Sequence, residues 1–324
     1  MRAYSSGELG DLDGYSLSDC APPRPQTGEL LVSVEATALG FVDQLVMRGL
    51  YQVRPPVPFV PGGEIVGRIE ALGSGVDGFA VGQRIACWQY GGGLAEKAIV
   101  DARYCVPVPT GITPVRGAAL LLDYLTAYHG LFDRAALKPG QTLLVTGASG
   151  GVGSAAVQLA SVCGAEVIAL ASGEDKQAMV RNLGAREVID YKDHGWRDAL
   201  KSTHPAGIDM VFDPVGGALF EKCFRSLAKK GRHLVVGFAS GDGIPSLPAN
   251  LPLLKSGELV GVDARYLWEE NPARTRQILS IILAMAHARK LDPPIARVFG
   301  LEDASGAIQF VTSKERLGKV VVVP

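Results

Sequence analysis

A glycine-rich loop between a strand pattern and a helix pattern constrains this chain more than any other feature. Apolar and β-branched residues occupy 143–146, glycines follow at 147, 150, 151 and 153, and an alanine-rich segment with helical spacing comes next. This order predicts a strand, a tight turn and a helix. Against the pattern G-x-G-x-x-G, Ala148 stands at the first position, and Gly150 and Gly153 hold the other two. Glycine there lets bare backbone approach a pyrophosphate, so the loop predicts nucleotide binding, although such turns also occur with nothing bound.

The end of the next strand pattern bears on the choice of nucleotide. An enzyme selective for NAD usually carries Asp or Glu there, about 20 residues after the loop, to bind the ribose 2′-hydroxyl. Here that place reads Ala171-Ser172-Gly173, and Lys176 and Arg181 follow. None of the three residues 171–173 is a carboxylate that would repel a 2′-phosphate, so the sequence favours NADPH over NADH. The alternative is that both cations are solvated charges on a surface helix.

Composition limits the classes of protein and partner. The 324 residues are 47% hydrophobic and 20% charged with a net charge of -1, as expected for a globular two-domain protein that binds neither nucleic acid nor an anionic membrane. No apolar run reaches the length of a membrane span, and the first residues lack the apolar core of a signal peptide, so we expect a cytoplasmic protein. The five cysteines form no C-x-x-C pair, and no two histidines lie three or four apart. These spacings predict neither a disulfide framework nor a metal site.

The rest of the chain divides into a β-rich region and an alternating region. Apolar and polar residues alternate in 29–39, 64–73, 83–88 and 95–109, which predicts a small barrel or sandwich, and a helical stretch begins near Pro114. From 142 onward, strand and helix patterns alternate, with further strands in 188–193, 207–217, 231–241 and 257–267. This rhythm predicts an α/β fold with a doubly wound parallel sheet. After an amphipathic helix over 272–291, a strand, a helix near Glu302 and a terminal strand return to the first domain.

Together these motifs resemble the medium-chain dehydrogenase/reductase superfamily, specifically its zinc-independent quinone oxidoreductase branch. The matching pieces, in family order, are ALGFVDQLVMRGLY, PGGEIVGRI, LTAY, LVTGASGGVG, VIDY, DPVGG, VVGFASG and SKERLGKVVV. The resemblance implies a GroES-like β-rich catalytic domain formed by residues 1–121 and 267–324, with a Rossmann NADP-binding domain at 122–266 inserted between them. It also implies a homodimer joined through the edge strand of the Rossmann sheet, near Leu259 to Ala264.

The resemblance also allows the zinc ligands to be checked position by position. Zinc-dependent relatives carry Cys in the loop that here spans 38–43, and His immediately before the residue that here is Glu64. This chain has no Cys in that loop, and Gly63 stands at the His position. Their structural zinc needs four clustered cysteines, where only Cys87 and Cys105 occur. We therefore expect no metal, and hydride transfer from NADPH to a small-molecule acceptor, either a quinone or an α,β-unsaturated carbonyl.

Site residues follow from the resemblance. Asp43 and Tyr51 are expected beside the nicotinamide and the acceptor. Tyr51 would donate a hydrogen bond to the acceptor oxygen, and Tyr124 is a second candidate donor. Asp43 would hydrogen-bond to its own loop. The alternative for each tyrosine is a cleft-lining or core aromatic. The resemblance also assigns residues to each part of the cofactor. Thr126 would bind the carboxamide, and the nicotinamide would lie against Gly237, Phe238 and Ala239. The pyrophosphate would lie on Ser149, Gly150, Gly151, Val152 and Gly153, the 2′-phosphate would be surrounded by Ser172, Lys176 and Tyr191, and Lys314 would lie near the adenine.

Three alternatives are weighed against this interpretation. The loop TGASGGVG also fits short-chain dehydrogenases, but none of the nine tyrosines has Lys four residues later. An enoyl-thioester reductase of polyketide or fatty-acid type shares the expected fold and loop. An NADPH-binding protein without catalysis, like the crystallins recruited from this family, is the third, because a fold does not fix a function. Gly40-Phe41 departs from the Asn-Pro common in quinone reductases, so the acceptor stays open.

Overall fold

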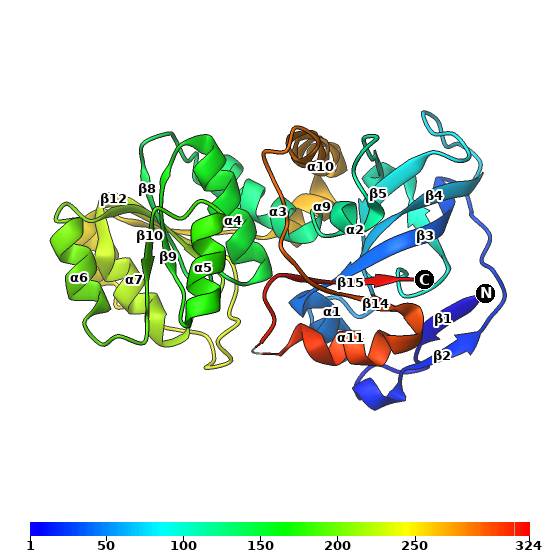
Figure 1. Ribbon diagram of the computed structural model, residues 1–324, viewed down its shortest axis with the longest axis horizontal. Helices are drawn as coiled ribbons and strands as arrows, with labels where there is room; N and C mark the ends of the chain where they lie inside the picture. Colours follow the sequence, from blue (N-terminus) through cyan, green and yellow to red (C-terminus); the bar gives the residue numbers. More distant parts are fainter. Residues whose placement is uncertain (314) are drawn as a thin grey trace. The chain divides into compact units, whose positions relative to one another are not determined.

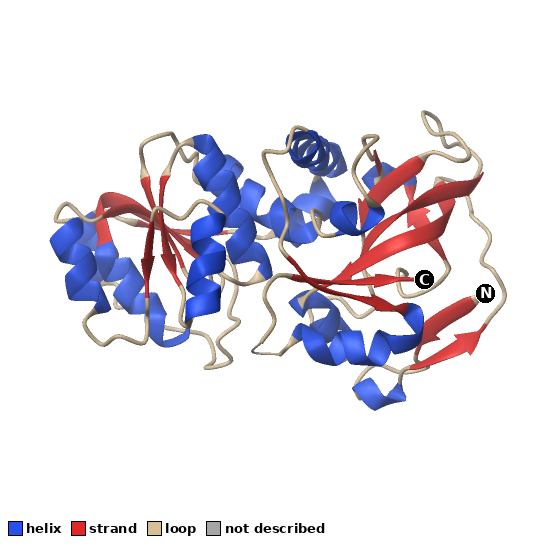
Figure 2. Cartoon of the chain, viewed as in Figure 1, coloured by secondary structure: helices blue, strands red, loops and turns tan. Residues whose placement is uncertain are grey.

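A computed structural model describes residues 1–313 and 315–324, and these divide into two compact units (Figure 1). One unit contains Met1–Leu122 and Leu267–Pro324, and the other contains Asp123–Tyr266. Each unit has its own sheet, with helices around it (Figure 2). Lys314, expected near the adenine, lies outside the described residues.

The first unit is built on a mainly antiparallel sheet in the order β14-β15-β3-β4-β5-β7, with β6 paired to β3. Its strands are β3 (Glu29–Leu39), β4 (Glu64–Leu72), β5 (Arg84–Trp88), β6 (Lys97–Asp101), β7 (Val106–Pro107), β14 (Ile295–Gly300) and β15 (Lys319–Val323), with a separate pair β1 (Arg2–Ser5) and β2 (Ser16–Asp19). Val321 on β15 pairs with Ala38 on β3, so the last strand of the chain lies in the same sheet as β3.

Side-chain alternation explains why these segments form a sheet. Along β3, Leu30 and Val32 are fully buried in a core shared with β4, β5 and β6, while the residues between them are half-buried. The helices of this unit are α1 (Phe41–Met47), α2 (Pro114–Ala118), α9 (Ala264–Glu270, which begins in the other unit), α10 (Pro272–His287) and α11 (Ala304–Val311). The amphipathic helix predicted from Pro272 is confirmed, with Ile278 and Ile282 completely buried.

The second unit is a six-stranded parallel sheet in the order β10-β9-β8-β11-β12-β13, which confirms the predicted doubly wound sheet. Its strands are β8 (Thr142–Val145), β9 (Glu166–Leu170), β10 (Glu187–Ile189), β11 (Ile208–Asp213), β12 (Leu227–Val235) and β13 (Glu258–Gly261). Its helices are α3 (Leu122–Tyr128, which begins in the first unit), α4 (Gly151–Cys163), α5 (Glu174–Asn182), α6 (Trp196–Thr203), α7 (Phe220–Ser226) and α8 (Asn250–Lys255). Figure 1 shows α4 and α5 on one face of the sheet and α6 and α7 on the other. The strand order reverses beside β8, and α/β folds bind ligands at that point.

The four strands predicted over 188–193, 207–217, 231–241 and 257–267 all end earlier than the sequence pattern indicates, the second at Asp213 and the third at Val235. The strand expected over 257–267 ends at Gly261, because the Asp263 side chain accepts the Tyr266 N–H at 3.0 Å and α9 begins at Ala264. The strand expected over 188–193 ends at Ile189, because Asp190 accepts the Lys192 N–H at 2.9 Å and turns the chain. Short polar side chains that bind nearby backbone end a strand in this way. Within the described residues, no helix has the length and apolar character to cross a membrane.

Candidate active site

The glycine loop after β8 is held by contacts that only glycine permits. Gly147 has a φ of +53°, and its carbonyl accepts the Gly150 N–H at 2.9 Å. A Cβ on Gly153 would lie 2.2 Å from that same carbonyl oxygen. Helix α4 therefore starts directly against the loop, with the amides of its first turn lacking helical acceptors. This arrangement brings together the residues predicted at the pyrophosphate, from Ser149 to Gly153, and it fits an anionic diphosphate.

Two further loops follow β11 and β12 at the carboxyl edge of the same sheet, as parallel strands require. The Ala239 N–H donates to the Pro214 carbonyl at 3.2 Å, and the Ser240 N–H donates to the Val215 carbonyl at 3.0 Å. A Cβ on Gly237 would lie 3.2 Å from the Pro214 carbonyl oxygen. The predicted nicotinamide residues, Gly237, Phe238 and Ala239, are thus fixed by backbone contacts to the loop 214–217, and Phe238 keeps 40% of its surface exposed.

The predicted 2′-phosphate residues lie at the ends of β9 and β10. Ser172 follows β9, Lys176 is in the first turns of α5, and Tyr191 is exposed after β10. The Ser172 hydroxyl donates to Asp190 Oδ2 at 3.1 Å. The expectation that no carboxylate lies at this end is therefore wrong, because it considered only the end of β9, and Asp190 comes from the next strand. Its motif, VIDY, is visible in the sequence, but its proximity to Ser172 depends on the pairing of β10 with β9.

Helix α3 carries two more predicted residues, both buried. Tyr124 is 1% exposed and Thr126 is 8% exposed. The same helix carries Asp123, which the sequence did not single out, and its Oδ2 lies 2.2 Å from the position of a Cβ on Gly151. A carboxylate beside the first turn of α4 is electrostatically favourable at a helix N-terminus. Gly151 is consequently a glycine because Asp123 occupies the space of its side chain.

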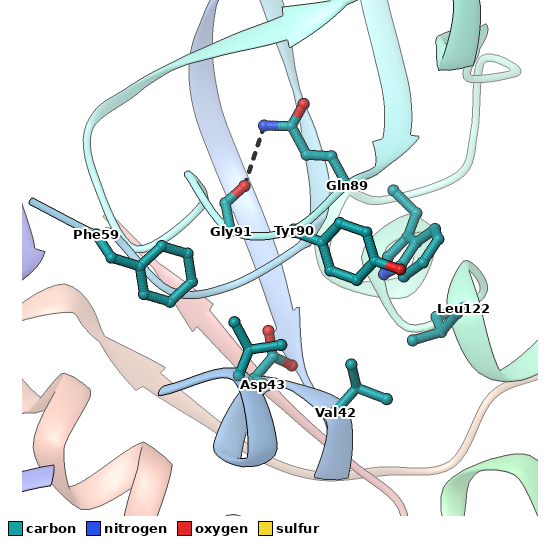
Figure 3. Close-up of a pocket in the computed structure, with 9 residues that line it drawn as sticks. Val42, Asp43, Phe59, Gln89, Tyr90, Gly91 and Leu122 are labelled. Atoms are coloured by element: carbon teal, nitrogen blue, oxygen red, sulfur yellow. Dashed lines mark hydrogen bonds between the residues drawn. The ribbon is translucent and has the colours of Figure 1, made fainter. Parts of the chain in front are cut away.

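The first unit contains a small pocket with about 250 Å³ of empty space, part of it open to solvent (Figure 3). Asp43 supplies its carboxylate, and Gln89 closes one side through a 3.0 Å hydrogen bond from Nε2 to the Gly91 carbonyl. The remaining lining is mostly apolar or aromatic: Val42, Val46, Phe59, Trp88, Tyr90 and Leu122. Its enclosed part measures only about 10 Å³, about the space of one water molecule, so the lining gives the chemical character of this wall and not room for a ligand.

Asp43 binds its own loop, as predicted, and also lines this pocket. Its Oδ2 accepts the Gly40 N–H at 2.7 Å, and its Oδ1 accepts the Gly63 N–H at 3.1 Å. Burial raises the pKa of this carboxyl, although the loop amides and the Lys319 ammonium act in the opposite direction. The side chain is therefore a fixed polar group in an otherwise apolar wall.

A buried ion pair lies beside Gly40, in the loop 38–43 where the resemblance implies a Cys ligand in zinc-dependent relatives. Lys319 Nζ is 2.5 Å from Glu64 Oε1, with side-chain exposures of 3% and 1%, and Glu64 Oε2 accepts the Leu122 N–H at 2.8 Å. A Cβ on Gly40 would lie 3.2 Å from Lys319 Nζ, and a Cβ on Gly63 would lie 2.0 Å from the Gln89 carbonyl oxygen. Among the residues that the structure describes, no group of three or more His, Cys, Asp or Glu side chains is placed to hold a metal ion.

Tyr51 is not among the residues that line the pocket, but it packs near Tyr90, which is, in an aromatic cluster that the sequence did not predict. Its half-buried ring lies 6.0 Å from the ring of Tyr90, measured between centroids. Tyr90 is edge-on to Trp88 at 5.2 Å and to Trp268 at 5.5 Å, and Trp268 Nε1 donates to the Trp88 carbonyl at 3.0 Å. These residues come from β5, the loop after it and α9, so no local spacing could have grouped them.

Family models match both units. Residues 26–110 match the alcohol dehydrogenase GroES-like domain, and residues 151–282 match the model described as zinc-binding dehydrogenase. Quinone oxidoreductase-like protein 2 of Bos taurus is 36% identical over 325 residues, which cover 99% of this chain and 93% of the relative.

Solved structures agree over the full length. A mycobacterial quinone oxidoreductase superposes with a TM-score of 0.91 at 28% identity, covering 100% of both chains. A mycobacterial protein solved in complex with NADPH gives the same TM-score, identity and coverage. With a GroES-like unit, a Rossmann unit and full-length relatives of this kind, the chain belongs to the medium-chain dehydrogenase/reductase superfamily, in its quinone oxidoreductase branch.

Proposed function

We propose that this protein is an NADPH-dependent reductase that transfers a hydride, without zinc, to a quinone or an α,β-unsaturated carbonyl. The observation that carries the proposal is the set of three glycine-containing loops at one edge of the parallel sheet. They fit a dinucleotide along their length, and the structural neighbour with NADPH has the same fold. The mostly apolar lining beside Asp43 supports an acceptor of low polarity.

In this proposal, the second unit holds the cofactor at four places. The first-turn amides of α4 bind the pyrophosphate, and the loop 237–239 supports the nicotinamide. Thr126 binds the carboxamide, while Ser172, Lys176 and Tyr191 surround the 2′-phosphate. NADPH, when bound, supplies the hydride, so the protein must position the nicotinamide and exclude water.

The first unit would bind the acceptor and stabilise the negative charge that develops on its oxygen. Tyr51 is the proposed hydrogen-bond donor to that oxygen, and Tyr124, a buried residue of the second unit, is the second candidate. Asp43 keeps the wall of the pocket in place through Gly40 and Gly63. Protonation of the product completes the reaction, from a tyrosine hydroxyl or from solvent.

One acceptor panel tests the activity and separates its alternatives. NADPH and NADH oxidation would be followed with a quinone, a 2-alkenal, a cyclic enone and a crotonyl thioester. We expect turnover with NADPH and the quinone, the alkenal or the enone. Preference for the thioester would assign an enoyl-thioester reductase instead, and tight NADPH binding without any turnover would favour a non-catalytic binding protein.

Lys176 provides a test of cofactor preference. Lys176→Glu replaces an attractive charge with a repulsive one, so the KM for NADPH should rise at least about tenfold, the value of one charged hydrogen bond. The KM for NADH, which lacks the 2′-phosphate, should change less than about twofold. Lys201→Glu, on α6 of the same unit, is the matched control and should alter neither constant. Equal weakening of both cofactors would remove Lys176 from the 2′-phosphate site.

Zinc independence is supported by what surrounds Gly40 and Gly63. Gly40 faces the Lys319 ammonium, and a side chain at Gly63 would collide with the Gln89 carbonyl, so this site offers neither of the usual ligands. Dialysis against a strong chelator should therefore leave kcat unchanged, while a zinc-dependent alcohol dehydrogenase treated in parallel loses activity. Loss of activity that added zinc restores would contradict the proposal.

We also propose a homodimer joined through β13, the last strand of the parallel sheet. Leu259 on this strand is 45% exposed, and Leu253 and Leu254 on α8 are 78% and 67% exposed. A charge on an edge strand opposes strand pairing, so Leu259→Lys should shift the sedimentation coefficient from dimer to monomer. Val162→Lys, at a 42% exposed position on α4, is the control. A wild-type protein that sediments as a monomer would rule this assembly out.

A further inference from the structure

Asp213, the last residue of β11, receives hydrogen bonds from three different segments of the second unit. Its carboxylate is 1% exposed. Oδ1 accepts from the Thr146 hydroxyl at 2.5 Å, from the Val215 N–H at 3.0 Å and from the Gly216 N–H at 2.9 Å. Oδ2 lies 3.1 Å from His233 Nε2 on β12. The donors flank the three loops proposed to hold the cofactor, at the ends of β8, β11 and β12.

His233 is arranged to donate to this carboxylate. Its ring is completely buried and packs against Phe220 at 4.6 Å between centroids. Within the described residues, His233 Nδ1 has no hydrogen-bond partner, so the ring proton belongs on Nε2, facing Asp213. Burial favours the neutral form of Asp213, but the bonds from His233, Thr146 and Gly216 outweigh it and lower the pKa of Asp213. The group is therefore an ionised carboxylate with both oxygens hydrogen-bonded.

The backbone around Asp213 ties the same loops together. The Asp213 carbonyl accepts the Val236 N–H at 3.0 Å and the Gly237 N–H at 3.4 Å. A Cβ on Gly147 would lie 2.7 Å from the Val215 Cγ2 methyl, so the glycine loop and the loop 214–217 are in direct contact. A shift of the carboxylate would consequently move the glycine loop, the loop 214–217 and the loop 236–240 relative to one another.

We propose that Asp213 is a positioning residue that fixes the pyrophosphate loop relative to the nicotinamide loop, so that one cofactor engages both. This inference rests on the proposed function. The 2′-phosphate residues follow β9 and β10, and none of them bonds to Asp213, so that end of the cofactor site lies outside its network. Asparagine cannot replace the carboxylate, because an amide has one acceptor oxygen and its NH₂ would face a donor.

Binding of two ligands tests this positioning role. Isothermal titration of wild type and Asp213→Asn would use NADPH, which spans all three loops, and 2′-AMP, which reaches only the 2′-phosphate end. We expect the Kd for NADPH to rise about 10- to 100-fold through the loss of charged hydrogen bonds, and the Kd for 2′-AMP to stay within about twofold. Unchanged NADPH binding, or equal weakening of both ligands, would overturn the proposal. If wild type itself does not bind NADPH, the proposed function fails instead.

A matched histidine pair controls for general effects on the fold. His204 Nε2 lies 3.0 Å from Glu187 Oε2 in the same unit, and neither residue bonds to the three loops. His204→Gln should therefore leave both Kd values unchanged. If His204→Gln raised the NADPH Kd as much as Asp213→Asn does, the loss of any carboxylate contact in this unit would have the same effect. That result would overturn the specific positioning role of Asp213.

Thr146 keeps the proposal falsifiable if Asp213→Asn does not fold. Thr146→Val removes only the hydroxyl that binds Asp213 at nearly constant shape, whereas Thr146→Ser retains it. We expect a several-fold higher NADPH Kd for Thr146→Val, near wild-type affinity for Thr146→Ser, and no change in the 2′-AMP Kd for either. Identical NADPH affinities for the two variants would contradict the network.

Discussion

The close approach of two glycines determines the architecture of the cofactor unit. The Gly147 carbonyl oxygen lies only 2.2 Å from where a Cβ on Gly153 would be, so helix α4 starts against the loop that ends β8. This contact directs the amides of the first turn of α4 toward the edge of the sheet, beside the point where strand order reverses. The loops after β11 and β12 converge on the same edge because all of these strands are parallel. In the proposed function, backbone geometry therefore provides most of the dinucleotide site, and the side chains adjust its selectivity.

The first unit relies on a different constraint, a buried ion pair beside an apolar pocket. Burying the charges of Lys319 and Glu64 costs free energy unless the two are paired. Their 2.5 Å contact pairs them, and the Leu122 N–H donates to the other carboxylate oxygen of Glu64. The pair lies next to Gly40, and Glu64 directly follows Gly63 in the chain. The wall beside this pair is mostly apolar, and the Gly40 and Gly63 amides fix the Asp43 carboxylate in it.

Local patterns in the sequence predicted much of the fold. The alternation in β3 and the glycines before α4 are properties of consecutive residues, and the structure has both elements where the patterns indicate. The lengths of β10 and β13 were overestimated, because Asp190 and Asp263 bind nearby backbone and end the strand pattern early. Apolar periodicity does not register such hydrogen bonds.

The site was predictable where its residues lie in one motif and not where they meet across strands. Ser149 to Gly153 are contiguous, so the loop could be recognised directly. Asp213 and His233 are 20 residues apart and meet only because β11 and β12 pair, and Lys319 reaches Glu64 from the other end of the chain. The cluster of Trp88, Tyr90 and Trp268 is assembled in the same way. Pairings of this kind require the tertiary structure, because sequence spacing gives no signal for them.

The measurement that tests the central claim most directly follows the hydride itself. Chelator-treated protein would be mixed with NADPH dideuterated at C4 and a cyclic enone, and the product would be analysed by mass spectrometry and NMR. Our account predicts one deuterium at the β-carbon of the product, and turnover that added zinc does not increase. A product without deuterium at that carbon, or a reaction that proceeds only after zinc is added, would contradict it.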